Sequence, residues 1–340
     1  MKPYTLLTST LLAASVLSIS SAASAAEINV YTTREPALIA PLLEAFTKSS
    51  GTKVNTVFMK DGLAERVASE GASSPADILM AVDAGNLVDL AEKGVTQPIE
   101  SSVLNAAVPE QLRDGKGNWF GLSMRARVLY VAKDLDLTTI NYEDLADPKW
   151  KGKVCIRAGQ HPYNTALFAD YIAHYGPEET EKWLTGLKAN LARKAAGGDR
   201  DSAKDILGGI CDVGVANSYY VGLMKSGKGG EEQVKWAEAI KVVLPTFKNG
   251  GTQVNISGAA VAKNAPNKAE AVKLLEYLVS DEAQKIYAEA NYEYPVKAGV
   301  AADPIIASFG ALKIDSKPLS EIVSHRKQAS ELVDKVGFDN

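Results

Sequence analysis

The sequence predicts a two-lobed α/β protein in which each lobe is a mixed, mostly parallel sheet flanked by helices, with extended segments crossing between the lobes. Three observations support this prediction. Setting aside residues 1–26 leaves 314 of the 340 residues, more than one hydrophobic core usually supports. Strand-like and helix-like segments alternate in the first half of the chain, and this alternation starts again after a long apolar run.

The N-terminal segment has the pattern of a secretory signal peptide. A single cation, Lys2, precedes an apolar stretch over residues 6–19, and small residues follow. This stretch is too short to span a membrane as a helix. No cysteine follows the expected cleavage point after Ala25 or Ala26, so no lipid anchor is expected. We therefore expect an exported, soluble mature protein.

The first half of the mature chain alternates short apolar runs with stretches whose apolar residues recur every three or four positions. The predicted order is a strand at residues 27–31, a helix at 37–49, a strand at 54–58, a helix at 63–70, a strand at 76–81 and a helix at 85–93. This order is typical of a parallel, doubly wound sheet.

The second half repeats the alternation. The predicted order is a strand at residues 154–156, helices at 165–175, 177–195 and 202–207, a strand at 212–216, and helices at 268–290, 304–309 and 319–336. The last two helices are expected to close over the second lobe.

Two extended runs are predicted to cross between the lobes. They lie at residues 123–132 and 240–247, and a strand at 256–262 returns the chain to the first lobe. Two crossings make each lobe discontinuous. The prediction is a first lobe of residues 27–124 and 247–295 and a second lobe of residues 125–246 and 296–340.

Charge and motif content argue against several function classes. The net charge of −4 becomes −5 once Lys2 is removed, and no basic stripe is present, so nucleic acid is not an expected partner. The sequence contains no Gly-x-Ser-x-Gly elbow, no His-Glu-x-x-His motif, no phosphate-binding glycine-rich loop and no zinc-type Cys/His spacing. An exported hydrolase therefore remains only as an alternative hypothesis, which turnover of a substrate by the metal-free protein would revive.

The two cysteines, Cys155 and Cys211, lie on short strand-like runs. An even number of cysteines in an exported protein favours one disulfide between them. Two buried free thiols are the alternative. A catalytic thiol is not supported, because no histidine stands at a spacing that would activate either cysteine.

Three tyrosines form a candidate metal site. Tyr219 and Tyr220 are adjacent, and Tyr163 lies upstream. Phenolates are hard anionic oxygen donors, which suit a hard trivalent cation such as ferric iron. Adjacent side chains on a strand point to opposite faces, so both reach one metal only where the backbone turns, as at a strand end. From the residues alone, packing of amphipathic rings at a strand end remains the alternative.

Five segments of the mature chain carry a family resemblance. They are residues 28–31 (Ile-Asn-Val-Tyr), 74–78 (Ser-Pro-Ala-Asp-Ile), 118–122 (Asn-Trp-Phe-Gly-Leu), 142–153 and 217–220 (Asn-Ser-Tyr-Tyr). Together and in order, they resemble the periplasmic ferric-iron-binding proteins of bacterial ABC importers. The resemblance implies a type II periplasmic binding protein fold, location in the periplasm, iron held between the lobes, no enzymatic activity, and delivery to an inner-membrane ABC permease. We expect the protein to be a monomer.

Carried over by position, the resemblance makes Tyr163, Tyr219 and Tyr220 the phenolate ligands of Fe(III). Some members of the family add a His-Tyr pair after the arginine of the first loop, but here Arg34 is followed by Glu35 and a proline. Three phenolates cannot complete an octahedron. Family members that lack first-lobe ligands use a synergistic anion, usually carbonate, and this chain is similar to them.

A bound carbonate needs paired donors, which a guanidinium provides. Arg34, in the first-lobe loop, and Arg125, at the first crossing, are the candidates, and Arg125 is preferred. Arg127 lies on the same strand face as Arg125 and is the alternative anion partner. Glu35 is a candidate extra ligand once the cleft closes, with a solvated loop charge as its alternative. His161 is expected to be exposed or to act outside the ligand shell.

A different ligand would be compatible with the same fold. In this second hypothesis the tyrosines form a wall that binds an organic molecule or an oxyanion. The aromatic content of 7% and the lack of a Trp-rich segment argue against an aromatic cage. If iron is the ligand, each phenol must lose a proton, which it normally holds up to a pKa near 10, so release is expected to be acid-sensitive.

Overall fold

The computed structural model describes residues 26–340, so the expected signal peptide of residues 1–26 lies outside them except for its last residue. Within the described residues, no helix combines the length and the apolar character needed to cross a membrane.

Ten strands form a mixed sheet that continues from one lobe into the other. They are β1 (Glu27–Thr32), β2 (Lys53–Phe58), β3 (Ile78–Ala81), β4 (Thr96–Gln97), β5 (Phe120–Ala132), β6 (Val154–Cys155), β7 (Val213–Asn217), β8 (Ile240–Val243), β9 (Val254–Ala262) and β10 (Tyr294–Pro295). The order is β2-β1-β3-β9-β5-β7-β6, with β10 and β8 paired to β5 and β4 paired to β9. Parallel pairing joins β1 to β2 and β3, and β6 to β7, whereas β5 and β9 pair antiparallel with their neighbours.

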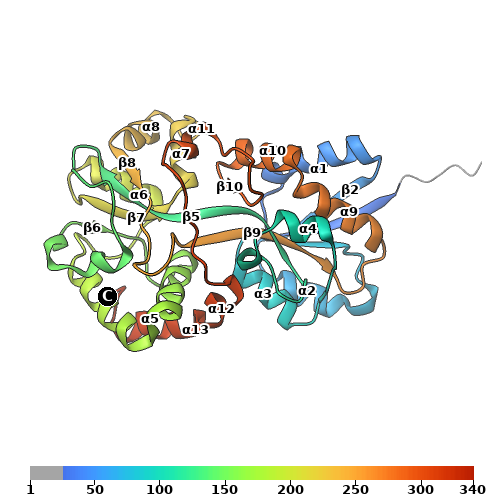
Figure 1. Cartoon of the computed structure of the whole chain (residues 1–340), viewed down its shortest axis with the longest axis horizontal. Helices are drawn as coiled ribbons and strands as arrows, with labels where there is room; N and C mark the ends of the chain where they lie inside the picture. The colour runs from blue at the N-terminus through green and yellow to red at the C-terminus, as the bar shows by residue number, and fades with distance from the viewer. Residues whose placement is uncertain (1–25) are drawn as a thin grey trace, which may run out of the picture.

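The long strand β5 connects the two lobes. Its residues 120–126 pair with β9, and its residues 127–131 pair with β7. In Figure 1, β5 and β9 run side by side through the middle of the molecule, with helices gathered at both ends. The predicted two-lobed α/β fold is confirmed, with β5 as a crossing strand. The second crossing predicted at residues 240–247 is wrong, because β8 pairs with residues 129–132 of β5 in the second lobe, and β9 runs beside β5 instead. The lobe boundaries expected from the sequence stay a prediction.

Thirteen α-helices of the described chain flank the sheet. They are α1 (Pro36–Ser50), α2 (Leu63–Glu70), α3 (Ala84–Glu92), α4 (Ser102–Ala107), α5 (Pro162–Ala189), α6 (Asp199–Leu207), α7 (Tyr219–Lys225), α8 (Glu231–Glu238), α9 (Lys268–Leu278), α10 (Asp281–Asn291), α11 (Pro304–Ala307), α12 (Leu319–Ser324) and α13 (Arg326–Lys335). Short 3-10 helices are η1 (Gly71–Ser73), η2 (Glu110–Leu112), η3 (Tyr142–Ala146) and η4 (Pro148–Trp150). Figure 1 places α1, α2, α3, α4, α9 and α10 at one end of the molecule and α5 to α8 at the other.

Three predicted helices differ from the structure at their interruptions and ends. The helix predicted over residues 268–290 is two helices, because the Ser280 hydroxyl accepts a hydrogen bond from the Ala283 amide and starts α10 afresh. The helix α5 kinks at Gly176, where φ is 78°, and it ends at Ala189 rather than at residue 195. The predicted C-terminal helix over residues 319–336 divides at His325 into α12 and α13.

A disulfide joins Cys155 in β6 to Cys211, two residues before β7. The predicted pairing is confirmed. Because β6 and β7 are neighbouring parallel strands, the bond fastens the sheet edge of the second lobe next to the strand that leads to the tyrosine pair.

Two contacts link the C-terminal parts of the chain across the lobes. An Arg326 Nη2 nitrogen lies 2.9 and 3.2 Å from the two carboxylate oxygens of Asp89 in α3. The ring of Tyr292, just after α10, covers Gly222 in α7 so closely that a Cβ on this glycine would lie 2.2 Å from Tyr292 Cγ. Gly222 is therefore required for the close approach of α7 and Tyr292.

Candidate metal centre

Tyr219 and Tyr220 occupy the first turn of α7, one residue beyond β7. The sequence predicted a strand end entering a loop, and the helix is a correction to that prediction. Successive residues on a helix are about 100° apart rather than on opposite faces, so neighbouring rings can lie close to each other. The two ring centroids are 4.2 Å apart.

The start of α7 is fixed to the crossing strand β5. The Ser218 amide donates to the Ala126 carbonyl at 3.0 Å, and the Ala126 amide donates to the Ser218 hydroxyl at 3.1 Å. These two bonds set the position of the tyrosine pair relative to the segment that carries Arg125.

Tyr163 enters the site from the beginning of α5. The His161 Nδ1 atom accepts a hydrogen bond from the Tyr163 amide at 3.2 Å and so caps this helix. The Tyr163 hydroxyl lies 3.3 Å from the Tyr219 hydroxyl, and either can be the donor. The structure therefore brings together the three tyrosines that the sequence singled out.

Burial controls the protonation of the tyrosine pair. Burial raises the pKa of Tyr219 well above its usual value near 10, and the neighbouring Tyr163 and Tyr220 raise it further. Burial also raises the pKa of Tyr220, with Tyr163 adding to the effect. Both side chains are therefore neutral phenols at neutral pH when no metal is bound, since like charges and low polarity disfavour phenolates.

Three guanidinium groups surround these rings. Arg157 Cζ lies 5.1 Å and Arg125 Cζ 5.6 Å from the centre of the Tyr163 ring, and Arg200 Cζ lies 5.5 Å from that of Tyr220. Cations at this range stabilise the electron-rich ring faces. They would also favour the phenolate forms that a metal needs.

Arg125 is the anion candidate with two buried unpaired nitrogens, whereas Arg34 and Arg127 each have one, Nε. Its Nη2 donates to the Val82 carbonyl at 2.9 Å and lies 3.5 Å from an Asp83 carboxylate oxygen. Its Nη1 and Nε are buried, and neither has a hydrogen-bond partner within residues 26–340. Buried unpaired donors are costly. An oxyanion in the cleft could accept from both of them.

Arg34, the other predicted anion partner, is already paired. Its Nη1 donates to Glu293 at 3.0 Å and to the Ser257 hydroxyl at 3.1 Å. Burial, the largest single influence, lowers the pKa of Arg34, but Glu293 together with Tyr287 and Tyr219 raises the pKa overall. Arg34 therefore contributes less free charge to the cleft than Arg125.

Arg127 was the alternative anion partner, and the structure engages it elsewhere. Its Nη1 donates to Asp199 at 2.7 Å and to the Asn217 side chain, and its Nη2 donates to Asn164. Both terminal nitrogens are used inside the second lobe, so Arg127 is not free to hold an anion.

The side chains meet at a cavity of about 260 Å³. It is lined by Thr33, Arg34, Glu35, Leu38, Val82, Arg125, Tyr163, Tyr219, Leu223, Asn291 and Glu293. Glu35 is exposed, as expected for a loop charge, but it does line this cavity. Tyr220 contacts Tyr219 without lining the cavity.

A second cavity of about 480 Å³ shares Val82 and Tyr163 with the first. Its lining includes His161, which is half-buried. Burial and the nearby Arg157 lower the pKa of His161 to about 4, so its imidazole is neutral at neutral pH. Its capping bond to α5 supports the expected role outside the ligand shell.

Sequence reasoning missed several residues that shape the site. Arg157 and Arg200 lie against the tyrosine rings, and Glu293 neutralises Arg34. Asp199 links these elements, because its carboxylate accepts from Arg127, Arg157 and the Asn217 amide. The sequence offered one signal for these arginines, which is their position near the end of a strand (Arg157) and at the start of a helix (Arg200). That position does not show which side chain each arginine contacts.

The chain matches a known protein family and has relatives of similar length. The family model for bacterial extracellular solute-binding proteins matches residues 73–308. Iron uptake protein A2 of Synechocystis sp. is 42% identical over 92% of this chain and 90% of its own length.

Solved structures agree with the match. The Bordetella ferric binding protein is 69% identical, with a TM-score of 0.90 over 92% of this chain and all of that chain. A Trichodesmium protein (IdiA, FutA), solved in complex with iron and citrate ligands, is 44% identical, with a TM-score of 0.87 over 92% of this chain and 99% of that chain.

Proposed function

The chain belongs to the bacterial extracellular solute-binding proteins and, within them, to the ferric-binding protein family, which has the type II periplasmic binding protein fold; on this premise, we propose that it captures Fe(III) in the cleft between its lobes. Tyr163, Tyr219 and Tyr220 supply phenolate ligands. A synergistic anion such as carbonate completes the shell and is held by Arg125. The loaded protein then delivers iron from the periplasm to an ABC permease.

One observation carries the proposal. The Tyr163 and Tyr219 hydroxyls are 3.3 Å apart, and both rings line the cavity that Arg125 also lines with unpaired donors. Phenolic oxygens supply a hard cation, and the guanidinium supplies an anion, so the two kinds of donor suit a metal and anion bound together.

Charge balance supports the same assignment. Three phenolates offset the 3+ charge of iron, and a carbonate makes the centre anionic. Arg125 opposes that excess charge, and Arg157 and Arg200 lie against the rings. Arg34 is the second candidate for the anion, and Glu35 is a further ligand candidate that depends on how far the cleft closes.

The relatives support iron as the cargo. The Bordetella neighbour is called a ferric binding protein, and the Trichodesmium neighbour was solved with iron and citrate. Citrate in that neighbour is an oxygen-rich anion accompanying iron, the same class of co-ligand that we propose here. Closure of the two lobes over the site would bury the metal and present one shape to the permease.

Visible absorption tests the ligand set. The wild-type protein loaded with Fe(III) in bicarbonate should be coloured by charge transfer from phenolate to iron. Tyr219→Phe should weaken or abolish this band, because it removes an oxygen donor. Tyr277→Phe is the matched control, since Tyr277 in α9 carries a buried hydroxyl that does not line the cleft cavity. An unchanged band in Tyr219→Phe would remove this residue from the ligand set.

A thermal-shift screen tests the cargo itself. Fe(III) with bicarbonate should raise the melting temperature in proportion to the logarithm of its concentration above Kd. A rise caused by an organic acid or oxyanion alone, with no response to iron, would instead support the second hypothesis of a different solute.

A further inference from the structure

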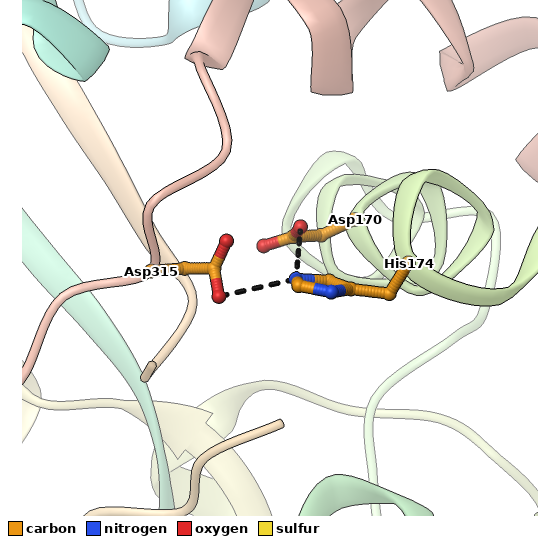
Figure 2. A group of neighbouring side chains, drawn as sticks. All are labelled: Asp170, His174 and Asp315. Atoms are coloured by element: carbon orange, nitrogen blue, oxygen red, sulfur yellow. Dashed lines mark ion pairs between the residues drawn. The ribbon is translucent and has the colours of Figure 1, made fainter. Parts of the chain in front are cut away.

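A buried group of three side chains lies in the second lobe, apart from the tyrosine cavity. Asp170 and His174 are one turn apart on α5, and Asp315 comes from the segment between α11 and α12. Figure 2 shows the His174 ring pointing between the two carboxylates. His174 Nε2 lies 3.1 Å from Asp315 Oδ2 and 3.7 Å from Asp170 Oδ1.

The two carboxylates are held very differently. Asp315 accepts from the Gly251 amide at 2.8 Å and from the Lys317 amide at 2.9 Å. Asp170 is fully buried, and neither of its oxygens has a hydrogen-bond partner among residues 26–340. His174 Nε2 is close to both carboxylates but forms a well-directed hydrogen bond with neither.

An unpartnered buried carboxylate is costly unless a proton or a cation offsets it. Burial raises the pKa of Asp170 well above its usual range, and the neighbouring Asp315 adds to this shift. A cation bound at the group would offset the charge of this buried carboxylate.

We propose that Asp170, His174 and Asp315 form a binding site for a divalent cation of the zinc type, separate from the tyrosine cavity. The donor set is one imidazole nitrogen and two carboxylate oxygens, all within 4.8 Å of one another. In a tetrahedral zinc site with bonds of about 2.0–2.1 Å, neighbouring ligand atoms are about 3.4 Å apart. The separations of 3.1 and 3.7 Å bracket this value.

Charge and coordination number narrow the choice of ion. Two carboxylates neutralise a 2+ ion, so the buried centre would carry no net charge. Calcium takes six to eight oxygen ligands, and magnesium demands an octahedron. Three side chains, one of them an imidazole, supply too few oxygens for either, whereas zinc accepts three protein ligands and one water.

The surroundings hold the three ligands in place. The His174 ring stacks on Phe247, with centroids 4.3 Å apart. A Cβ on Gly250 would lie 2.1 Å from Asp315 Oδ2 and 2.9 Å from His174 Cε1, so a glycine is needed to close the loop over the group. A bound ion would tie α5 to the segment before α12, and Asp315 in turn accepts from the Gly251 amide of this loop, which leads into β9.

The test uses the full mature chain with Tyr219→Phe and Tyr220→Phe, stripped of metal, so that the cleft competes less for the added ion. Calorimetric titration with zinc chloride should give one bound equivalent. The melting temperature should rise with zinc concentration, as expected for an ion that binds the folded state. Absence of zinc binding by this parent would overturn the proposal.

Two substitutions in the parent locate the site. Asp170→Asn and His174→Gln should each abolish the zinc-dependent thermal shift, while His325→Gln, a control at a histidine outside the group, should retain it. A shift that persists in both site variants would overturn the proposal. So would an Asp170→Asn variant that is stabilised while the parent binds no zinc, because the group would then hold only a proton.

Anomalous diffraction decides the matter if the site variants fail to fold. Crystals of the parent soaked in zinc should give a peak at the zinc absorption edge between Asp170, His174 and Asp315. A peak elsewhere, or no peak, would contradict the proposal without reference to the variants.

Discussion

The two walls of the cleft carry opposite chemistry. The second-lobe wall presents the hydroxyls of Tyr163 and Tyr219, both placed at helix beginnings. The first-lobe wall presents Arg34 and Glu35, and Arg125 lies on the strand that joins the lobes. Acidic oxygens that must lose protons therefore face cationic groups that can hold an anion.

The walls also differ in how their geometry is fixed. Tyr163 and Tyr219 belong to the same predicted lobe, so the distance between their hydroxyls does not depend on the angle between the lobes. Arg34 reaches the site from the other lobe, and its position relative to the tyrosines changes with any hinge motion. On the proposed ligand set, the tyrosine hydroxyls are therefore arranged before closure, whereas the contributions of Arg34 and Glu35 depend on it.

The largest expected effect concerns the protons of the tyrosine wall. Because burial raises the pKa of Tyr219 and of Tyr220, each holds a proton at neutral pH and must release it to bind iron. Each released proton contributes tenfold per pH unit, so the protons of Tyr219 and Tyr220 alone should lower the affinity about 100-fold for each unit that the pH drops below neutrality, and any further proton released makes the fall steeper. Competition against a chelator of known proton dependence, between pH 8 and 6, measures this slope.

The matched variants test the tyrosine side in the same assay. Tyr220→Phe should lower the slope by one proton, which is a factor of about ten in affinity per pH unit, and Tyr277→Phe should leave the slope unchanged. A wild-type slope below one proton would show that the phenols do not bind as phenolates, and the metal assignment would then fail.

The second prediction concerns the anion side. Arg125→Gln removes the guanidinium with unpaired Nη1 and Nε, so iron affinity in bicarbonate should fall about 10- to 100-fold, the usual cost of losing a group that supports a metal ligand. Removing bicarbonate should weaken the wild type by a similar factor and affect the variant little. Isothermal titration with and without bicarbonate provides the comparison.

Arg113→Gln is the control for a lost positive charge, because Arg113 contacts Val108 and Asn105 and does not line the cleft cavity. Equal sensitivity to bicarbonate in wild type and Arg125→Gln would assign the anion to another residue, with Arg34 as the next candidate.

The elements of this site that could be predicted from sequence are those with a strong local signal. The crossing strand β5 is a long apolar run, and the tyrosine pair stands out as a motif. The helix α7 was missed because it has only seven residues, too few for a helical period to emerge. Its start is fixed instead by the bonds between Ser218 and Ala126, which are distant in sequence.

Charge pairing was the least predictable property. Arg34, Arg125 and Arg127 were all candidates for the anion, because a sequence shows that an arginine is present but not which carboxylate it meets. Glu293 reaches Arg34 and Asp199 reaches Arg127 from remote segments. Only the three-dimensional structure shows that Arg125 keeps a buried terminal nitrogen unpaired, whereas Arg34 and Arg127 are each paired with a carboxylate.

The smallest expected effect concerns the contact between the lobes. A single Arg326 nitrogen, Nη2, lies within hydrogen-bond range of both Asp89 carboxylate oxygens, but the two side chains are 43% and 37% exposed. Pairs of this kind contribute about 1 kcal/mol or less. Arg326→Ala should therefore shift the lobes toward a more open arrangement and weaken iron binding by about fivefold or less, without changing the visible band. Small-angle scattering and titration measure the two effects.

Lys327→Ala is the matched control, because Lys327 is its neighbour in α13, is 90% exposed and lies 3.9 Å from Glu331 on the same helix. It should change neither the scattering profile nor the affinity. A loss of the visible band in Arg326→Ala would contradict the inference that the tyrosines are positioned independently of the contact between the lobes. The distance between the Tyr163 and Tyr219 hydroxyls would then depend on a contact between the lobes. The second-lobe wall would take its geometry only when the lobes close.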